Sequence, residues 1–371
     1  MKLKIAAVIA IIAVGLLAIS LGPTGLFALG GEEKALEIGV SLGLSGSTAL
    51  DNGKIMKGIE MALEEANAKG GINGNMLRLV VEDDKCDGKE GATIISRFAN
   101  ATGIPVIIGG SCSSVTLAMA PIAREKGVVL ISPYSSNPAL VNEKIFRTIS
   151  NDLLEAGAMA NFAHNELGLK RIGFLYVNND YGKGLVDEFK ARFEEFGGNV
   201  VAEETFNVNE KDFRTQLMKL EESSAEAVYV VAYLGEFIPL FKQKKELGFE
   251  KQILTITILE QPEILQQAGK EAEGTIFTTI FTDPSPEFRE KFHAKYGEEA
   301  NFWHAIGYDT MNAVVKAIET GGYNEAGIRK ALQEMDFRGA ANRIKFNEFG
   351  DAEYEVAIKQ VKEGKFVPYD N

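Results

Sequence analysis

Short apolar runs alternate with stretches of helical periodicity through the first part of the chain. The run at residues 36–40 predicts a strand. The apolar positions that follow it recur at helical spacing and share one face: Ile55, Ile59, Ala62, Leu63 and Ala66. Further strands are predicted at 77–81, 106–108 and 128–131, and further helices at 91–99 and 116–126. This alternation predicts a parallel sheet with helices on both faces.

The same alternation restarts after residue 148. Helices are predicted at 152–166, 184–196, 213–222 and 237–247, and strands at 171–176, 200–206, 228–231 and 252–257. The remainder predicts an extended segment at 275–279, helices at 286–296, 303–320 and 326–334, and strands at 343–346 and 354–361, the last in a hairpin with 366–367. Because 371 residues exceed the usual size of one core, we expect two α/β lobes. A cleft between them would bind a small ligand at the carboxyl ends of the strands.

The N-terminus indicates where the protein works. Lys2 and Lys4 precede an uncharged apolar run at 5–21 and a small-residue stretch at 28–31, which is the pattern of an export signal. We expect residues 1–31 to be a signal peptide or, because the run is long, an N-terminal membrane anchor. The body of the protein is therefore expected in the periplasm or on the outer face of the cell membrane.

Charge and cysteine content exclude several classes of partner. The formal charge of −13 argues against nucleic acid, whose phosphates such a surface repels. Outside the cytosol, two cysteines favour the paired state, and closing the loop from Cys86 to Cys112 would contribute ~3 kcal/mol. Two cysteines and three histidines offer too few ligands for a metal site. We expect neither a metal nor a cofactor.

The stretch at 109–114, Gly-Gly-Ser-Cys-Ser-Ser, lies where a predicted strand passes into a helix. The backbone N–H groups of Ser113, Ser114 and Val115 would be unpaired there and would attract a carboxylate or phosphate. The hydroxyl of Ser113 or Ser114 would either cap the helix or cap it and also contact the ligand.

An enzyme would use the same turn differently. A Ser nucleophile needs Gly-x-Ser-x-Gly, but Ser113 stands where the second glycine belongs. None of the three histidines, His164, His293 and His304, lies in a motif that marks a general base. We therefore expect no enzymatic activity, with a Ser or Cys hydrolase as the alternative to be excluded.

Two more loops follow predicted strands. Residues 131–138 contain Tyr134 and Ser136 between two prolines that fix the backbone. Residues 178–184 contain Tyr181 but lack the glycine spacing of a dinucleotide site. Tyr181, and Tyr233 after the strand at 228–231, could each line a cleft with an apolar ring and a polar tip.

Taken together, these stretches resemble the branched-chain amino acid (leucine/isoleucine/valine) binding proteins of ABC importers. The motifs that carry the resemblance are residues 38–40 with 44–46, 67–75, 82–87, 109–114, 131–138, 180–182 and 211–213. It implies a periplasmic-binding-protein type I fold, two Rossmann-like lobes joined by a three-segment hinge, and a disulfide between Cys86 and Cys112. It also implies lobe 1 at 36–149 and 276–344, and lobe 2 at 150–275 and 345–371.

The resemblance further implies how a ligand is held and delivered. Its carboxylate would bind at Ser113 and at the loop of Tyr134 and Ser136, while Tyr181 and Tyr233 close over it. A membrane permease would be the partner.

The sequence departs from the family at the acidic residue of the second lobe that pairs the ligand's ammonium. Spacing after Gly248 puts Thr257 there, and Glu260 is the nearest carboxylate. Glu260 is therefore the candidate for that role. Without such an acid a buried ammonium would be unpaired, so a small non-amino carboxylate or amide is the alternative ligand. A ligand-binding sensor component is the alternative function.

Overall fold

The structure is a computed structural model that describes residues 35–143 and 145–369. The predicted export segment, residues 1–31, lies outside the described residues. Among the helices that the structure does describe, none combines the length and the apolar character needed to cross a bilayer.

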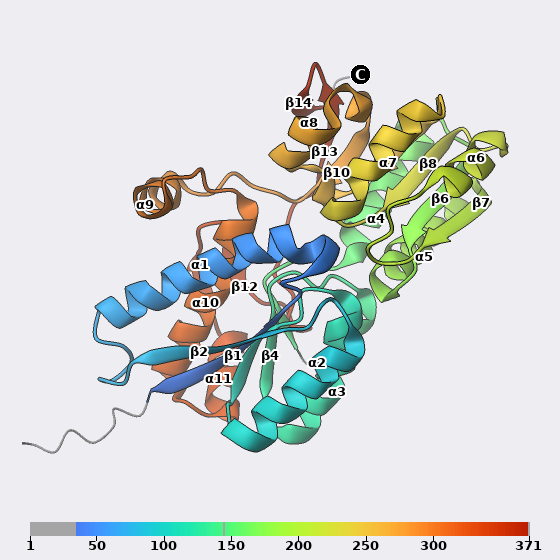
Figure 1. Cartoon of the computed structure of the whole chain (residues 1–371). Coiled ribbons are helices and arrows are strands. Elements are labelled where there is room, and N and C mark those ends of the chain that lie inside the picture. The colour runs from blue at the N-terminus through green and yellow to red at the C-terminus, as the bar shows by residue number, and fades with distance from the viewer. Residues whose placement is uncertain (1–34, 144, 370–371) are drawn as a thin grey trace, which may run out of the picture. The chain divides into compact units, whose positions relative to one another are not determined.

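The first sheet has five parallel strands in the order β2-β1-β3-β4-β5. They are β1 (Leu36–Leu42), β2 (Leu77–Asp83), β3 (Val106–Gly109), β4 (Val129–Ser132) and β5 (Phe146–Arg147). Helices α2 (Gly88–Arg97) and α3 (Ser113–Lys126) cover one face, and α1 (Ala49–Ala68), α10 (Phe302–Gly321) and α11 (Glu325–Gln333) cover the other (Figure 1). We call this sheet and its helices lobe 1, with α9 (Pro286–Tyr296), whose Phe288 packs on Tyr308 of α10.

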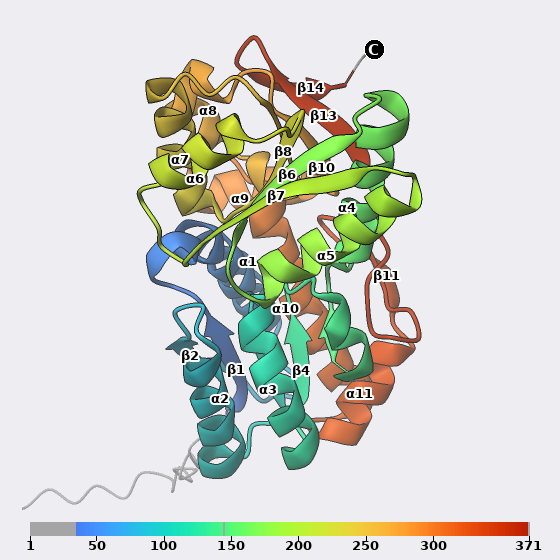
Figure 2. The same ribbon diagram turned by 90° about the vertical axis from the view of Figure 1, so that its right-hand side faces the viewer.

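The second sheet has seven strands in the order β14-β13-β10-β9-β8-β6-β7. They are β6 (Arg171–Val177), β7 (Asn199–Phe206), β8 (Ala227–Val231), β9 (Gln252–Thr255), β10 (Ile276–Thr279), β13 (Ala357–Lys362) and β14 (Lys365–Pro368). Its helices are α4 (Asp152–Asn161), α5 (Asp180–Glu195), α6 (Arg214–Glu222), α7 (Leu234–Glu246) and α8 (Pro262–Ala268). In Figure 2, α4 and α5 lie together on one face, in agreement with their packing. We call this unit lobe 2.

Both sheets confirm the predicted α/β class. The strands β6 to β10 are parallel, and the predicted C-terminal hairpin is confirmed by the antiparallel pairing of β13 with β14. The chain passes between the sheets after β5, after β10 and again between the short strand β12 (Arg343–Lys345) and β13. The lobe boundaries given above stay a prediction. Strand β10, at the start of the segment predicted for lobe 1, pairs with β9 and β13 in the larger sheet.

Several helices begin before their first apolar-periodic residue. Helix α5 begins at Asp180 rather than at residue 184, because the Asn179 side chain caps it by accepting the N–H of Gly182 at 3.0 Å. Helix α4 ends earlier than predicted, at Asn161, and continues as a π-helical turn, Phe162–Glu166.

Helices α1 and α10 cross unusually closely. A Cβ atom added to Gly58 would lie 2.0 Å from the carbonyl oxygen of His304, and one added to Gly307 would lie 2.1 Å from that of Ile55. Only glycine therefore fits at both positions. The close crossing joins a helix from the start of the chain to one near its end within lobe 1.

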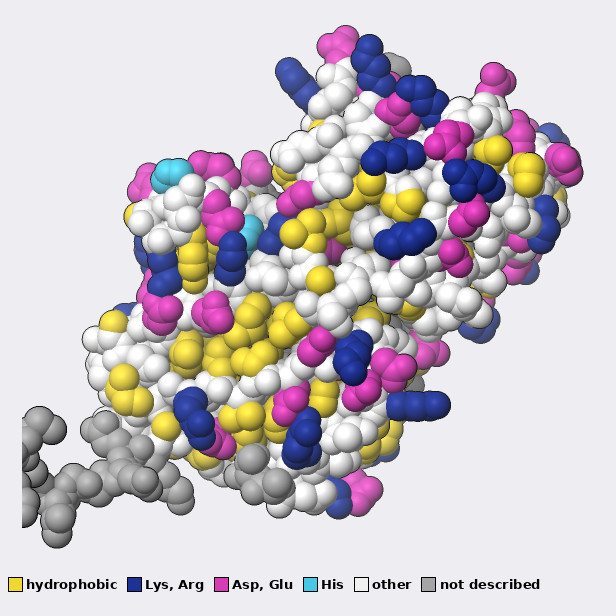
Figure 3. Space-filling model, in the orientation of Figure 1, with side chains coloured by type: hydrophobic (Ala, Val, Ile, Leu, Met, Phe, Trp, Pro, Cys, Tyr) yellow, Lys and Arg dark blue, Asp and Glu magenta, His cyan; other side chains and the backbone are white. Residues whose placement is uncertain are grey.

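The surface carries charges of both signs side by side. Figure 3 shows Lys and Arg interspersed with Asp and Glu on the face it presents. Exposed pairs such as Lys183 with Asp187 at 2.8 Å, and Arg192 with Glu188 at 2.9 Å, follow helical spacing. This arrangement indicates a solvated surface, in line with the composition.

Candidate functional site

The stretch at 109–114 connects β3 to α3. Gly109 has a φ of 149°, and a Cβ atom there would lie 2.2 Å from the carbonyl oxygen of Ser41, so this position requires glycine. Helix α3 begins at Ser113, and its N-cap Cys112 makes no side-chain cap. The N–H groups of Ser113 and Ser114, in the first turn, lack acceptors within the helix. The predicted third donor is wrong, because the Val115 N–H donates to the Cys112 carbonyl at 3.1 Å.

Cys86 and Cys112 are joined by a disulfide, with their Cα atoms 5.6 Å apart. The bond ties the start of α3 to the loop after β2. Cys86 Sγ also lies 3.6 Å from the hydroxyl of Tyr233, which comes from lobe 2. A cysteine in a disulfide cannot act as a nucleophile, so this pairing removes the chemistry that a thiol enzyme would need.

The loop after β4 is fastened to the same turn. Ser132 Oγ donates to the Gly110 carbonyl at 2.6 Å and accepts the N–H of Ser135 at 2.8 Å. Ser113 Oγ accepts the N–H of Asn137 at 3.3 Å. The turn at 109–114 and the loop after β4, together called the polar loops, are therefore joined by hydrogen bonds into one unit at the carboxyl ends of β3 and β4.

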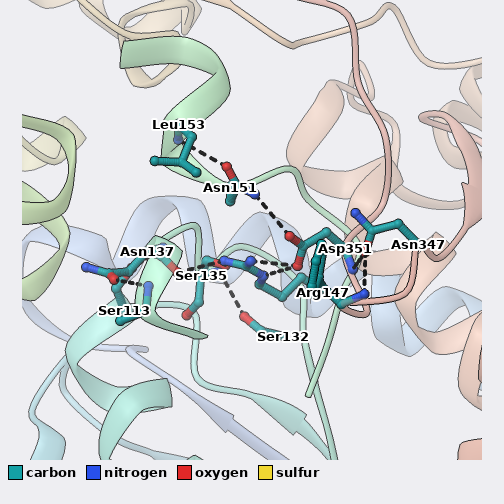
Figure 4. Close-up of polar contacts among 11 residues, drawn as sticks. Ser113, Ser132, Ser135, Asn137, Arg147, Asn151, Leu153, Asn347 and Asp351 are labelled. Carbon is teal, nitrogen blue, oxygen red and sulfur yellow. Dashed lines mark hydrogen bonds and ion pairs between the residues drawn. The ribbon is translucent and has the colours of Figure 1, made fainter. Parts of the chain in front are cut away.

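Arg147 supports this unit from β5 (Figure 4). Its guanidinium is fully buried, donates to the Asn137 carbonyl at 2.9 Å, and pairs with Asp351 at 2.6 Å. Asp351 also accepts a hydrogen bond from Asn151 at 3.1 Å. These contacts join the polar loop to two of the segments that pass between the sheets.

Aromatic rings from both lobes flank the polar loops. The rings of Tyr181 and Tyr233 stack with centroids 5.2 Å apart and planes 15° apart. Asn179 Nδ2 donates to the Tyr233 hydroxyl at 3.1 Å. On the lobe 1 side, Tyr134 packs on Trp303 with centroids 4.3 Å apart. Burial raises the pKa of Tyr134 and Tyr181 well above the usual range, so both hydroxyls are neutral donors.

The two lobes hydrogen-bond directly to each other. Ser47, in the 3-10 turn Gly46–Thr48 just before α1, donates its N–H to Asn209 at 2.6 Å and its hydroxyl to Glu236 at 3.1 Å. Lys54 pairs with Glu263 at 2.6 Å and donates to Gln261 at 3.0 Å. The structure therefore shows the lobes in contact around the polar loops.

The predicted ligand residues are only partly brought together. Ser113, Tyr134, Tyr181 and Tyr233 belong to the connected group described above. Ser136 lies in the same loop, where its side chain hydrogen-bonds Asp152. Ser114 lies beside Ser113 in the first turn of α3 and is half-buried.

Glu260 stands apart from these residues. Its carboxylate pairs with Lys359 and accepts the hydroxyl of Thr279 at 2.6 Å. The predicted role of Glu260 stays a prediction, and the residue has two partners of its own.

Sequence reasoning missed two buried acids, Asp152 and Glu155, in the first turn of α4. The signal available in the sequence was the capping residue Asn151 followed by Asp152 and, three residues after that, Glu155. That pattern also fits an ordinary helix start, where acids favour the helix dipole. Their burial against lobe 1 residues was not readable from the sequence.

Known proteins match almost the whole described chain. A family model for periplasmic binding proteins matches residues 35–365. The Leu/Ile/Val-binding protein homolog 2 of Brucella abortus is 30% identical over 338 residues, covering 88% of this chain and 90% of the relative.

Two solved structures share the fold as well as the sequence. A leucine binding protein from Thermotoga maritima is 30% identical, with a TM-score of 0.82, over 91% of this chain and 98% of its own. A branched-chain amino acid transporter substrate binding protein from Streptococcus pneumoniae, solved with isoleucine, is 27% identical, with a TM-score of 0.80, over 90% of this chain and 98% of its own.

Proposed function

The chain belongs to the periplasmic binding protein family, and from this premise we propose that it captures an amino acid outside the cytoplasm for an ABC importer. The family consists of solute-binding proteins, so the chain is a binding protein and not an enzyme. Its fold is that of the type I periplasmic binding proteins. The proposed partner is the membrane permease of the importer.

The proposed ligand is a branched-chain or related amino acid. The observation that carries the proposal is the first turn of α3, with two N–H groups and the Ser113 hydroxyl. Ser113 bonds Asn137 in the loop that also holds Tyr134, and Cys112 is joined to Cys86, whose sulfur contacts the Tyr233 hydroxyl of lobe 2. Such a turn suits a carboxylate. Tyr181 and Tyr233 supply flat apolar surface beside it for an aliphatic side chain. The names of the relatives support the same ligand class.

The proposed mechanism is hinge closure. Ligand held by both lobes stabilises the closed state by its difference in affinity between the closed and open states. The bonds of Ser47 and Lys54 to lobe 2 would then form only on closure. The closed pair of lobes would present its surface to the permease.

A thermal-shift screen of the purified protein tests the proposal. Leucine, isoleucine, valine, threonine and alanine are compared with deaminated carboxylates of the same carbon skeleton. We expect one or more amino acids to raise the melting temperature, because a ligand that binds the folded state stabilises it. A shift with the deaminated acids alone would replace the amino acid by a small carboxylate, and no shift with any compound would refute the proposal.

Replacing Ser113 with alanine is expected to weaken amino acid binding about 10-fold, through the loss of one hydrogen bond to a charged group. Titration calorimetry measures the effect. Ser96→Ala is the matched control, because that hydroxyl donates to the Ala92 carbonyl of its own helix, at 2.7 Å. Equal affinity of the Ser113 variant and the wild type would rule out the hydroxyl as a ligand contact.

A further inference from the structure

Asp152 and Glu155 are two acids buried within one turn of α4. Their exposed fractions are 3% and 8%. Oδ2 of Asp152 is buried without a hydrogen-bond partner, and so is the hydroxyl of Tyr181 nearby. In the part of the chain that the structure describes, neither acid forms an ion pair. Buried carboxylates without a cation are costly, so these two positions need an explanation.

The groups around Glu155 come from several elements. Oε1 of Glu155 accepts the backbone N–H of Thr257 at 3.3 Å, and the nearby hydroxyl of Thr278 is itself buried without a hydrogen-bond partner. The titratable groups close enough to interact with it are Asp152 on α4, Tyr134 of lobe 1, Tyr181 on α5 and Tyr229 on β8. Each of these is neutral or acidic.

Burial raises the pKa of Glu155 to about 8 and that of Asp152 to about 7. The cation that acts on Asp152 is Arg147, whose guanidinium is already paired with Asp351. Among the described residues, both carboxyl groups therefore lie near hydroxyls and aromatic rings but near no cation that lacks an acidic partner.

These acids lie next to the carboxylate-holding loops. The Asp152 N–H donates to the Ser136 carbonyl at 2.7 Å, and the Ser136 side chain hydrogen-bonds the Asp152 carboxyl. The same loop is fastened to Ser113 through Asn137. The proposed anion site therefore lies close to the two acids. An amino acid likewise carries its carboxylate and its ammonium group close together, on one α-carbon.

We propose that Glu155, together with Asp152, holds the ammonium group of the ligand. This inference rests on the proposed function and names the residues that make the site specific for an amino acid. Within the described residues, no group of three metal-binding side chains is present, so an organic cation fits better than a metal ion.

Glu260 is the competing candidate. It is linked to Thr257 by two hydrogen bonds. Thr257 Oγ1 donates to Thr279 Oγ1 at 3.3 Å, and Thr279 Oγ1 donates to Glu260. Lys359 already neutralises Glu260. Glu155, which accepts the backbone N–H of Thr257, forms no ion pair within the described residues.

The test compares L-leucine, L-valine and L-alanine with 4-methylpentanoate, 3-methylbutanoate and propanoate by titration calorimetry. Glu155→Gln is expected to weaken binding of the amino acids about 30-fold and to leave binding of the deaminated acids unchanged or tighter. Folding should tolerate the change, because glutamine has the shape of the protonated glutamate and its amide oxygen can still accept the Thr257 N–H. Melting curves of the unliganded variant check this.

Glu260→Gln is the matched control and should keep the affinity of the wild type. If the wild type binds an amino acid and Glu155→Gln binds it equally well, the inference is wrong while the proposed function stands. Loss of affinity in Glu260→Gln alone would transfer the role to Glu260. If the wild type binds none of the three amino acids, the proposed function fails and this inference with it.

Proton release gives a readout that a merely structural role would not change. At pH 7 the raised pKa leaves Glu155 mostly protonated, and an arriving ammonium lowers that pKa. Amino acid binding should then release a proton, seen as a heat that depends on the ionisation enthalpy of the buffer. Glu155→Gln should release fewer protons, and an unchanged release would contradict the assignment.

Discussion

Replacing Arg147 with methionine is expected to lower the free energy of unfolding by about 3–5 kcal/mol. Arg147 is fully buried, and its partner Asp351 is almost so. Without the guanidinium, the Asp351 carboxylate keeps only neutral hydrogen-bond donors, and the carbonyl of Asn137 loses one of its two donors. An uncompensated buried charge costs more than the ion pair contributes, which is why removing one partner has a large effect.

Urea unfolding followed by the fluorescence of Trp303, the single tryptophan of the chain, measures this loss. The double variant Arg147→Met with Asp351→Leu should recover a large part of it, because no charge is then left unpaired. Arg343→Met provides the exposed counterpart, since Arg343 pairs with Asp336 at the surface, and it should cost no more than about 1 kcal/mol. An equal decrease in the free energy of unfolding for Arg147→Met and Arg343→Met would show that burial of the Arg147–Asp351 pair does not increase the cost of breaking it.

Gly58→Ala is expected to destabilise the protein by about 1–3 kcal/mol or more, because the new methyl group would overlap the His304 carbonyl in α10. The helices α1 and α10 must then separate. Gly53→Ala, in the same helix, is the matched comparison. No atom lies within 4 Å of a Cβ at Gly53, so alanine should stabilise α1 there by about 0.5–1 kcal/mol.

Both glycine variants are compared with the wild type by urea unfolding. The two substitutions change helix propensity equally, so the difference between them reports the contact with α10. Equal stability of Gly58→Ala and Gly53→Ala would contradict the close contact between α1 and α10 at Gly58.

The sequence predicted the fold where apolar periodicity is strong. The positions from Ile55 to Ala66 mark α1 correctly, and the apolar run at 106–108 lies in β3. Helix starts were less predictable, because α5 begins with polar residues that Asn179 caps. Periodicity of apolar residues carries no information about such a first turn, whereas the Asn-Asp pair before Tyr181 does.

The turn proposed to bind the ligand's carboxylate was predictable from the sequence. The acids proposed to bind its ammonium group were not. Gly109 and Ser113 could be identified because a strand that passes into a helix exposes N–H groups in any parallel sheet. Glu155 could not, since an acid in the first helical turn is usually exposed. It becomes a site candidate only through Thr257, which is 102 positions away in sequence.

The crossing of α1 and α10 has a consequence for how the protein is made. Lobe 1 begins with the first described residues, but its core includes α10. Its fold therefore cannot be completed before the ribosome has translated residue 321. The sheet of lobe 2 needs a still later segment, the hairpin of β13 and β14 at residues 357–368. During synthesis neither lobe can therefore complete its fold until most of the described chain has been made. For a protein of this family, which works outside the cytoplasm, that order favours passage through the membrane before folding.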